Sequence, residues 1–293
     1  MPLDDAFMID TQEARLAAVY HAPQKDHYGL KLGCIILVGG PQYRVGAHRQ
    51  YVALARGLAK RGVGVLRFDY QGMGDSTGTL QAMEDRGADI EAASNALSER
   101  LGRNAKIFPW GLCEGASAIF MHNHRIVNMA GAIIANPWVG DARIEAQVRW
   151  RHYYLGRLNL SYMKNRIQSR PLFGGNFFKN AKGFLRGVEY FDQDPYSPAL
   201  TNLPDDMAYL LARNRPILYI ASTDDRERET FDYALSSEPR WKQAHNKSIL
   251  IRKELTGADH TFSTARAKQK VEDVTFNFID EQTRPIGALA PAA

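Results

Sequence analysis

Cys113 lies between two glycines where a predicted strand meets a predicted helix. The junction reads Gly111-Leu-Cys-Glu-Gly115, with apolar residues before it and an Ala-rich segment after it. Small residues on either side allow the chain to turn sharply, with the central side chain at the apex. A thiol at a helix N-terminus gains thiolate character from the helix dipole. The pattern predicts a nucleophilic cysteine, and the alternative is a buried structural thiol.

Such a nucleophile needs a base and a third group that orients the base. His260 follows an apolar segment at 247–252 that predicts a strand, and acidic residues follow an earlier predicted strand at 216–221. Nucleophile, acid and histidine in this order, each just past a strand, can meet at the carboxyl edge of a parallel sheet. We therefore predict that His260 is the base for Cys113; an exposed loop histidine is the alternative.

Two aspartates, Asp224 and Asp225, are candidates for the acid. In the Gly-x-x-Asp form of such a loop, Ser222 stands at the glycine and Asp225 falls at the acid. We predict Asp225 as the acid, with Asp224 as the alternative. Either carboxylate could instead cap the helix that follows, because aspartate is a common N-cap residue.

An oxyanion hole needs two backbone N–H donors fixed before the reaction begins. One donor is expected from Glu114, directly after the nucleophile. The other is expected from Gly39-Gly-Pro-Gln42, the loop after the first strong strand. Pro41 has no N–H group, so Gln42 is the better candidate.

Two further motifs do not indicate a cofactor. The glycine-rich loop at 72–78 has three residues where the dinucleotide fingerprint has two, and no helix begins directly after it. His122 and His124 are two residues apart on a predicted helix, so they do not share a face and are a poor metal pair. We expect neither a metal nor another cofactor.

Apolar strand-like segments alternate with helical ones through the first half of the chain. The expected strands are 32–38, 63–68, 105–110 and 130–135, and the expected helices are 48–60, 83–103 and 113–124. This order predicts an α/β fold with a parallel sheet and helices on both faces. Strands at 216–221 and 247–252 resume the sheet, and a helix at 265–280 ends it. Residues 14–20 have the content of a peripheral strand, although a helix is also compatible with them.

The domain organisation follows from where this alternation stops. We predict a core made of residues 1–136 and 205–283, an insertion at 137–204 with no comparable strand, and a disordered tail at 284–293. Cys34 lies inside an apolar run and is expected to be an inert core thiol.

Composition excludes several classes of protein. Hydrophobic residues make up 45% of the chain and the net charge is +5, so the total charge does not imply nucleic-acid binding. Two cysteines argue against a disulfide framework. No apolar run reaches the roughly 18 residues of a membrane span, and the acidic N-terminus lacks a secretory signal. We expect a cytoplasmic protein; peripheral membrane contact and the oligomeric state stay open.

The insertion is basic and aromatic. Between Arg143 and Arg186 there are ten Lys and Arg residues against one Glu, interleaved with aromatic side chains. One interpretation is a solvated basic helix face with aromatics packed on the core. The other is a lid that attracts an anionic substrate, an acyl-carrier partner or a membrane surface. The candidate substrate-binding residues on this second interpretation are Arg149, Arg151, Tyr153 and Tyr154.

Several motifs resemble a known family. Asp69-Tyr-Gln-Gly-Met-Gly-Asp-Ser76 is similar to the Asp-x-Arg-Gly-x-Gly-x-Ser loop of α/β-hydrolases. Residues 38–50, 66–76 and 110–117 more narrowly resemble the exosortase A system-associated hydrolase 1 family. The resemblance implies an α/β-hydrolase fold with an inserted helical lid, in a bacterial cytoplasmic enzyme encoded near exopolysaccharide and protein-sorting genes. The chain departs from the usual loops at Gln71, where arginine is common, and at Ser222.

The expected activity is hydrolysis of an ester or thioester through an acyl-enzyme on Cys113. The substrate would be a small acyl compound, with anionic, lipid-linked and saccharide-linked compounds as candidates. Two alternatives stay open: an acyltransferase that passes the acyl group to a saccharide or lipid hydroxyl, and a non-catalytic binding protein with the same fold.

Overall fold

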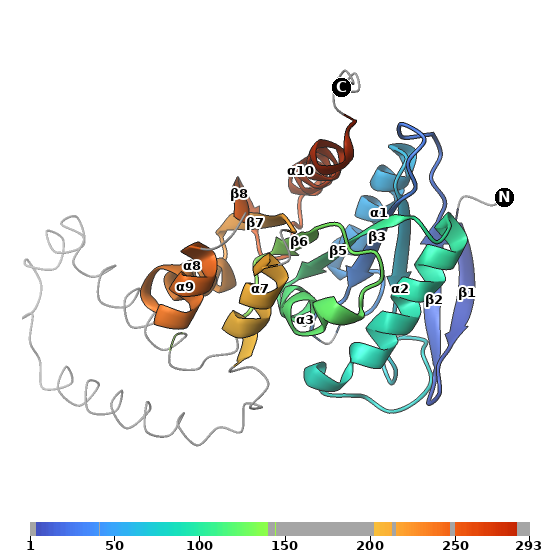
Figure 1. Ribbon diagram of the computed structural model, residues 1–293, viewed down its shortest axis with the longest axis horizontal. Coiled ribbons are helices and arrows are strands. Elements are labelled where there is room, and N and C mark those ends of the chain that lie inside the picture. Colours follow the sequence, from blue (N-terminus) through green and yellow to red (C-terminus); the bar gives the residue numbers. More distant parts are fainter. Residues whose placement is uncertain are drawn as a thin grey trace, which may run out of the picture.

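One sheet of eight strands runs through the part of the chain that the structure describes (Figure 1). The computed structural model describes residues 4–40, 42–139, 144, 202–212, 215–246 and 250–285. In their order across the sheet the strands are β1 (Asp4–Asp10), β2 (Arg15–His21), β4 (Gly64–Phe68), β3 (Leu32–Leu37), β5 (Lys106–Leu112), β6 (Ala132–Ala135), β7 (Ile217–Asp224) and β8 (Leu250–Asp259).

From β4 to β8 every neighbouring pair is parallel, whereas β1, β2 and β4 pair antiparallel. The four strands predicted between residues 32 and 135 are confirmed, each within two residues at either end. They were recognisable because every residue of β3, β4 and β6 is buried, which gives a continuous apolar run. Residues 14–20 are confirmed as a strand and are not helical.

The edges of the sheet differ from the prediction. β1 was not predicted, and β7 and β8 continue beyond the expected ends at 221 and 252. Side chains 252–254 of β8 are exposed and most of β1 is only partly buried, so neither strand has the apolar run of a central one. The longer strands have a consequence for the site: Asp225 and His260 each directly follow the end of one of two neighbouring parallel strands.

Helices cover both faces of the sheet. They are α1 (Gln50–Lys60), α2 (Gly87–Leu101), α3 (Glu114–His122), α7 (Leu203–Ala212), α8 (Arg226–Ser237), α9 (Pro239–Asn246) and α10 (Ala265–Thr283). The helices predicted at 48–60, 83–103, 113–124 and 265–280 are confirmed, and short 3-10 turns at Ala47–Arg49 and Met83–Asp85 precede α1 and α2. α7 and α9 have no counterpart among the predicted helices.

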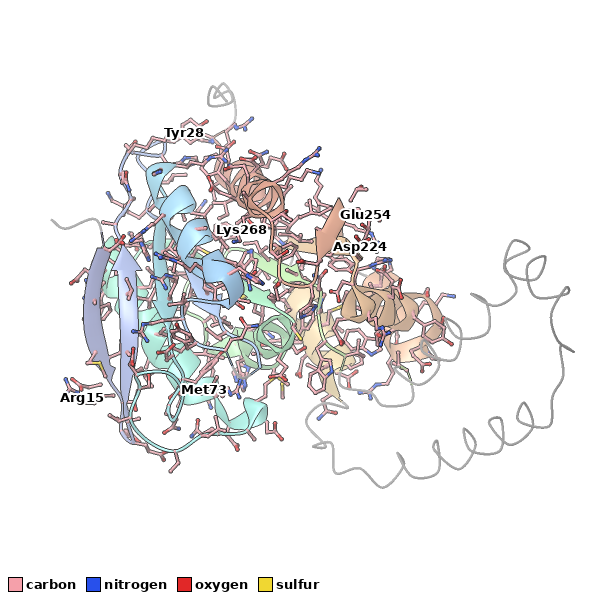
Figure 2. The ribbon with its side chains drawn as sticks, turned by 180° about the vertical axis from the view of Figure 1, so that it is seen from behind. Arg15, Tyr28, Met73, Asp224, Glu254 and Lys268 are labelled. Atoms are coloured by element: carbon pink, nitrogen blue, oxygen red, sulfur yellow. The ribbon has the colours of Figure 1, made fainter. Side chains whose placement is uncertain are left out.

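The two faces carry different helices. α2 and α3 lie on the face seen in Figure 1, and α1 and α10 lie on the opposite face, seen in Figure 2. Lys268 of α10 donates a hydrogen bond from Nζ to the His48 carbonyl at 2.7 Å, which joins α10 to the start of α1. The centre of the core is aromatic and aliphatic, with Phe108, Trp110 and Ile133 buried between these layers.

Part of the predicted domain organisation lies outside the described residues. This applies to nearly all of the insertion at 137–204 and to residues 286–293 of the expected tail. Leu203 and Pro204 begin α7, which packs against α3 and α9. No helix in the described part of the chain is long and apolar enough to cross a bilayer.

Candidate active site

Cys113 occupies a strained turn between β5 and α3. Its φ is 57° and its ψ is −124°, a conformation that residues other than glycine rarely adopt. A backbone in such a region costs on the order of 1–3 kcal/mol and persists only where its surroundings impose it. The Cys113 carbonyl accepts hydrogen bonds from the N–H groups of Ala116 and Ser117 in the first turn of α3. The side chain is partly exposed at the start of the helix, as the sequence predicted for an apex residue.

Glycines on either side make this turn sterically possible. A Cβ atom at Gly115 would lie 2.3 Å from the Leu37 carbonyl oxygen, and one at Gly111 would lie 2.3 Å from the Gly115 carbonyl. These contacts involve backbone atoms, which cannot swing aside as a side chain can. The turn therefore packs directly on the end of β3, and the small residues that the sequence pattern pointed to are required by that packing.

His260 and Asp225 form a hydrogen-bonded pair beside this turn. His260 Nδ1 lies 2.9 Å from Asp225 Oδ2, and the Asp225 side chain is only 4% exposed against 33% for His260. The other carboxylate oxygen, Asp225 Oδ1, accepts the Glu227 N–H at 3.1 Å and caps α8. One carboxylate therefore makes the contact that each interpretation of Asp225 requires. Asp224 is exposed at the end of β7 (Figure 2) and accepts a hydrogen bond from Thr223 Oγ1.

Electrostatics link His260 to the cysteine. Burial lowers the pKa of His260, but hydrogen bonds to Asp225 and Cys113, and the charges of both, outweigh it and raise the pKa to about 10. Near neutral pH the imidazole ring is therefore protonated, with Asp225 on one side and the Cys113 sulfur on the other. The structure thus brings together the three side chains that the sequence singled out.

Asn136 joins the loops that carry the acid and the histidine. Its Oδ1 accepts the Ser222 N–H at 2.9 Å, and its Nδ2 donates to Ser222 Oγ at 2.9 Å and to the His260 carbonyl at 3.2 Å. The residue is fully buried and has a φ of 41°. The sequence reasoning missed this residue; an Asn-Pro pair directly after a predicted strand is the turn signal that could have found it.

Ser222 explains one departure from the usual acid loop. Its buried hydroxyl donates to the Asp259 carbonyl at 3.1 Å while it accepts from Asn136. A glycine at this position could make neither bond, so the serine connects the ends of β7 and β8 in this chain. The sequence identified the departure but could not show what the hydroxyl contacts.

The loop after β3 lies against the turn at Cys113. A Cβ atom at Gly39 would be 2.5 Å from the Leu112 carbonyl oxygen and 3.1 Å from the Glu114 nitrogen. Glu114 is the first residue of α3, and the first N–H groups of a helix have no partner within the helix. Further along the loop, Gln42 Oε1 accepts the Ala47 N–H at 3.2 Å. The two predicted oxyanion donors, Glu114 and Gln42, thus belong to adjacent segments.

The remaining candidates have different outcomes. Arg149, Arg151, Tyr153 and Tyr154 lie outside the described residues. Cys34 is fully buried and burial raises the pKa of its thiol, as expected of a core cysteine. Within the described ranges, no group of three or more His, Cys, Asp or Glu side chains is arranged to hold a metal ion.

A family model matches most of the chain. The sequence profile described as "Alpha/beta hydrolase family" matches residues 35–274. A search of curated protein sequences gave no significant match.

Solved structures share the fold at low sequence identity. The esterase Pf2001 of Pyrococcus furiosus is 16% identical with a TM-score of 0.62, over 95% of this chain and 90% of that one. Est1E of Butyrivibrio proteoclasticus with bound ferulic acid is 18% identical with a TM-score of 0.61, over 96% and 100%. An alpha-beta serine hydrolase homologue from Coxiella burnetii is 13% identical with a TM-score of 0.58, over 94% and 97%. At these identities the likeness concerns the fold alone.

Proposed function

Because the chain belongs to the alpha/beta hydrolase family, we propose that it hydrolyses an ester or thioester through Cys113, His260 and Asp225. The observation that carries this proposal is the contact between His260 and both other groups, at a cysteine whose backbone is strained into the apex of a turn. The esterase name of the Pyrococcus furiosus protein supports an ester as the substrate class. The Coxiella burnetii protein is described as a serine hydrolase homologue. The proposed chemistry differs from that of a serine hydrolase in that the attacking atom is a sulfur and not an oxygen.

The proposed reaction begins with the Cys113 sulfur as a thiolate and His260 as an imidazolium. The sulfur attacks the carbonyl carbon, a C–S bond forms, and the carbonyl electron pair moves onto oxygen. The backbone N–H groups of Glu114 and Gln42 would bind this oxyanion, since fixed donors act most strongly where charge develops. When the tetrahedral intermediate collapses, the bond to the leaving alkoxide or thiolate breaks and His260 supplies its proton.

The second half of the reaction regenerates the enzyme. Water loses a proton to the now neutral His260 and attacks the carbonyl carbon of the thioester formed with Cys113. The C–S bond then breaks, the thiolate of Cys113 re-forms and a carboxylic acid leaves. Asp225 keeps Nδ1 of the ring occupied throughout, so that Nε2 faces the reacting atoms.

We further propose that the substrate is anionic and belongs to the chemistry of exopolysaccharide systems. The support is the resemblance of residues 38–50, 66–76 and 110–117 to an exosortase-associated hydrolase family, together with the basic and aromatic composition of 143–186. Charge reversal at Arg149 and Arg151 is expected to raise KM and flatten its salt dependence. If neither quantity moves, the basic segment takes no part in recognition.

Alkylation with iodoacetamide tests the proposed nucleophile directly. Cys113 should react and the buried Cys34 should not, and His260→Ala should slow the reaction of Cys113. His124→Ala, at an exposed residue of the short 3-10 turn that follows α3, is the matched control and should leave the rate unchanged. Equal labelling of both cysteines, unaffected by His260→Ala, would overturn the catalytic interpretation.

Hydrolysis of a short p-nitrophenyl ester completes the test. Cys113→Ala should abolish turnover. Cys113→Ser separates two possibilities, because retained activity would show that serine chemistry suffices at this apex, whereas lost activity would show that the thiolate is required.

A further inference from the structure

We propose that the Glu114 side chain positions the loop after β3, residues 39–49, so that Gln42 presents its backbone N–H to the developing oxyanion. The proposal rests on the function proposed above, in which Glu114 contributes only its backbone N–H. It adds a role for the Glu114 side chain. In this role Glu114 is a positioning residue, because its carboxylate does not touch the reacting atoms.

The carboxylate of Glu114 binds the loop at Gly40. Glu114 Oε2 accepts the Gly40 N–H at 2.8 Å, although the two residues are 74 positions apart in the chain. Gly40 has a φ of 60°, a conformation in which glycine carries no steric cost, so no side chain opposes this approach. A hydrogen bond to an ionised acceptor is among the stronger ones in proteins. The loop is therefore attached to the residue that follows the nucleophile.

A second attachment holds the far side of the loop at Arg44. The Arg44 N–H donates to Asp69 Oδ1 at 2.6 Å, and the Arg44 carbonyl accepts from Arg67 Nη1 at 2.6 Å. The Arg44 guanidinium also pairs with Asp69 and Asp75. The Asp69 side chain is fully buried, so this attachment is anchored in the core next to β4.

Gln42 lies midway between the two attachments. It is two positions after Gly40 and two before Arg44, and its side chain accepts the Ala47 N–H. A segment this short has little freedom once both ends are fixed. Removing the Glu114 carboxylate would release only the end nearest the nucleophile and leave the Asp69 attachment in place.

The expected effect is on the transition state more than on binding. A donor that is out of place weakens the interaction with the oxyanion, which exists only during the reaction. Loss of an oxyanion donor costs roughly 10²–10³-fold in kcat, and a donor that is displaced but present should cost less, about 10-fold. KM for a p-nitrophenyl ester should stay within about twofold.

Three variants test this inference. Glu114→Ala removes the acceptor, Glu114→Gln keeps an oxygen that can accept the Gly40 N–H, and Glu91→Ala is the control. Glu91 is an exposed residue of α2 that pairs with Arg125 at 2.8 Å. We expect kcat to fall about 10-fold in Glu114→Ala, to recover most of that loss in Glu114→Gln, and to stay unchanged in Glu91→Ala. Equal losses in the alanine and glutamine variants, or no loss in either, would overturn the inference.

Two further readouts separate this inference from the proposed function. Alkylation of Cys113 has no oxyanion, so the alanine and glutamine variants should react with iodoacetamide at the same rate. Hydrogen–deuterium exchange of residues 42–47 should be faster in Glu114→Ala than in Glu114→Gln or the wild-type protein. This exchange result stands whether or not the protein hydrolyses esters, and unchanged exchange would refute the positioning role. Turnover that survives Cys113→Ala would instead refute the proposed function.

Discussion

Asp225 serves two structural purposes with its two oxygens, and a pair of substitutions separates them. Oδ2 binds His260 and Oδ1 caps α8 through the Glu227 N–H. An asparagine side chain at this position would keep an oxygen for the cap but lose the negative charge, whereas alanine would remove both. We therefore compare Asp225→Asn with Asp225→Ala, and use Asp224→Asn as the control at the exposed neighbouring aspartate.

The expected magnitudes follow from these contacts. Asparagine and aspartate are about equally good N-caps, so Asp225→Asn should change the free energy of unfolding by no more than about 0.5 kcal/mol through the cap. Asp225→Ala should lose about 1 kcal/mol from the same contact. Both should lower kcat steeply, by roughly 10⁴-fold where the acid acts as in known triads, because the ring loses the group that fixes its tautomer.

The pH profile supplies an independent measure. Burial lowers the pKa of His260, and the Asp225 hydrogen bond is the strongest influence that raises it to about 10. Without that carboxylate the pKa should fall, so the imidazolium would lose its proton at a lower pH in both variants. The assay is ester hydrolysis and iodoacetamide alkylation from about pH 5 to pH 10, a range that spans the ordinary and the raised pKa of histidine, together with urea unfolding. Wild-type turnover in Asp225→Asn, or a large loss in Asp224→Asn, would refute the assignment of the acid.

Two other predictions concern the surrounding framework. Asn136→Ala removes three hydrogen bonds that join Ser222 to His260. It should lower the free energy of unfolding by about 3 kcal/mol and reduce kcat. A change below about 1 kcal/mol in urea unfolding would contradict this prediction. The pKa of His21 is lowered to about 4, chiefly by burial and also by the charge of Arg67. Between pH 4 and 6.5 the folded protein therefore binds fewer protons than the unfolded chain. The free energy of unfolding should therefore fall by about 3 kcal/mol as pH drops through that window, and more steeply than in His21→Gln. The measurement is urea unfolding at a series of pH values. If the free energy of unfolding depends on pH equally in both proteins, His21 does not have this role.

The sequence predicted the centre of the fold better than its edges. Strands β3, β4 and β6 are continuous apolar runs, and such runs are recognisable without knowledge of their neighbours. β8 is exposed over 252–254, so its length depends on pairing with β7, which the local sequence does not contain. α7 packs against α3 and α9, which are distant from it in the chain, and α9 also packs against α8, the helix directly before it.

The same distinction applies to the candidate site. Cys113, Asp225 and His260 were identifiable because each follows a strand in a fixed order along the chain. The Asn-Pro turn signal could have singled out Asn136, but the roles of Asn136 and of the Glu114 carboxylate depend on which atoms they contact 86 and 74 residues away. Spacing along a chain predicts which side chains reach the same edge of a sheet, but it does not predict the hydrogen bonds that hold them there.

The order of strands across the sheet has a consequence for how the site is assembled. From β5 onward the strands lie side by side in chain order, β5-β6-β7-β8, so each new strand joins the edge left by the one before it. Cys113 follows the first of these strands and His260 follows the last. A chain emerging from the ribosome can complete the turn around its thiol well before residue 260 has been synthesised. Cys113, the proposed nucleophile, is therefore in place before His260, the proposed base, and the two side chains can meet only when β8 pairs with β7.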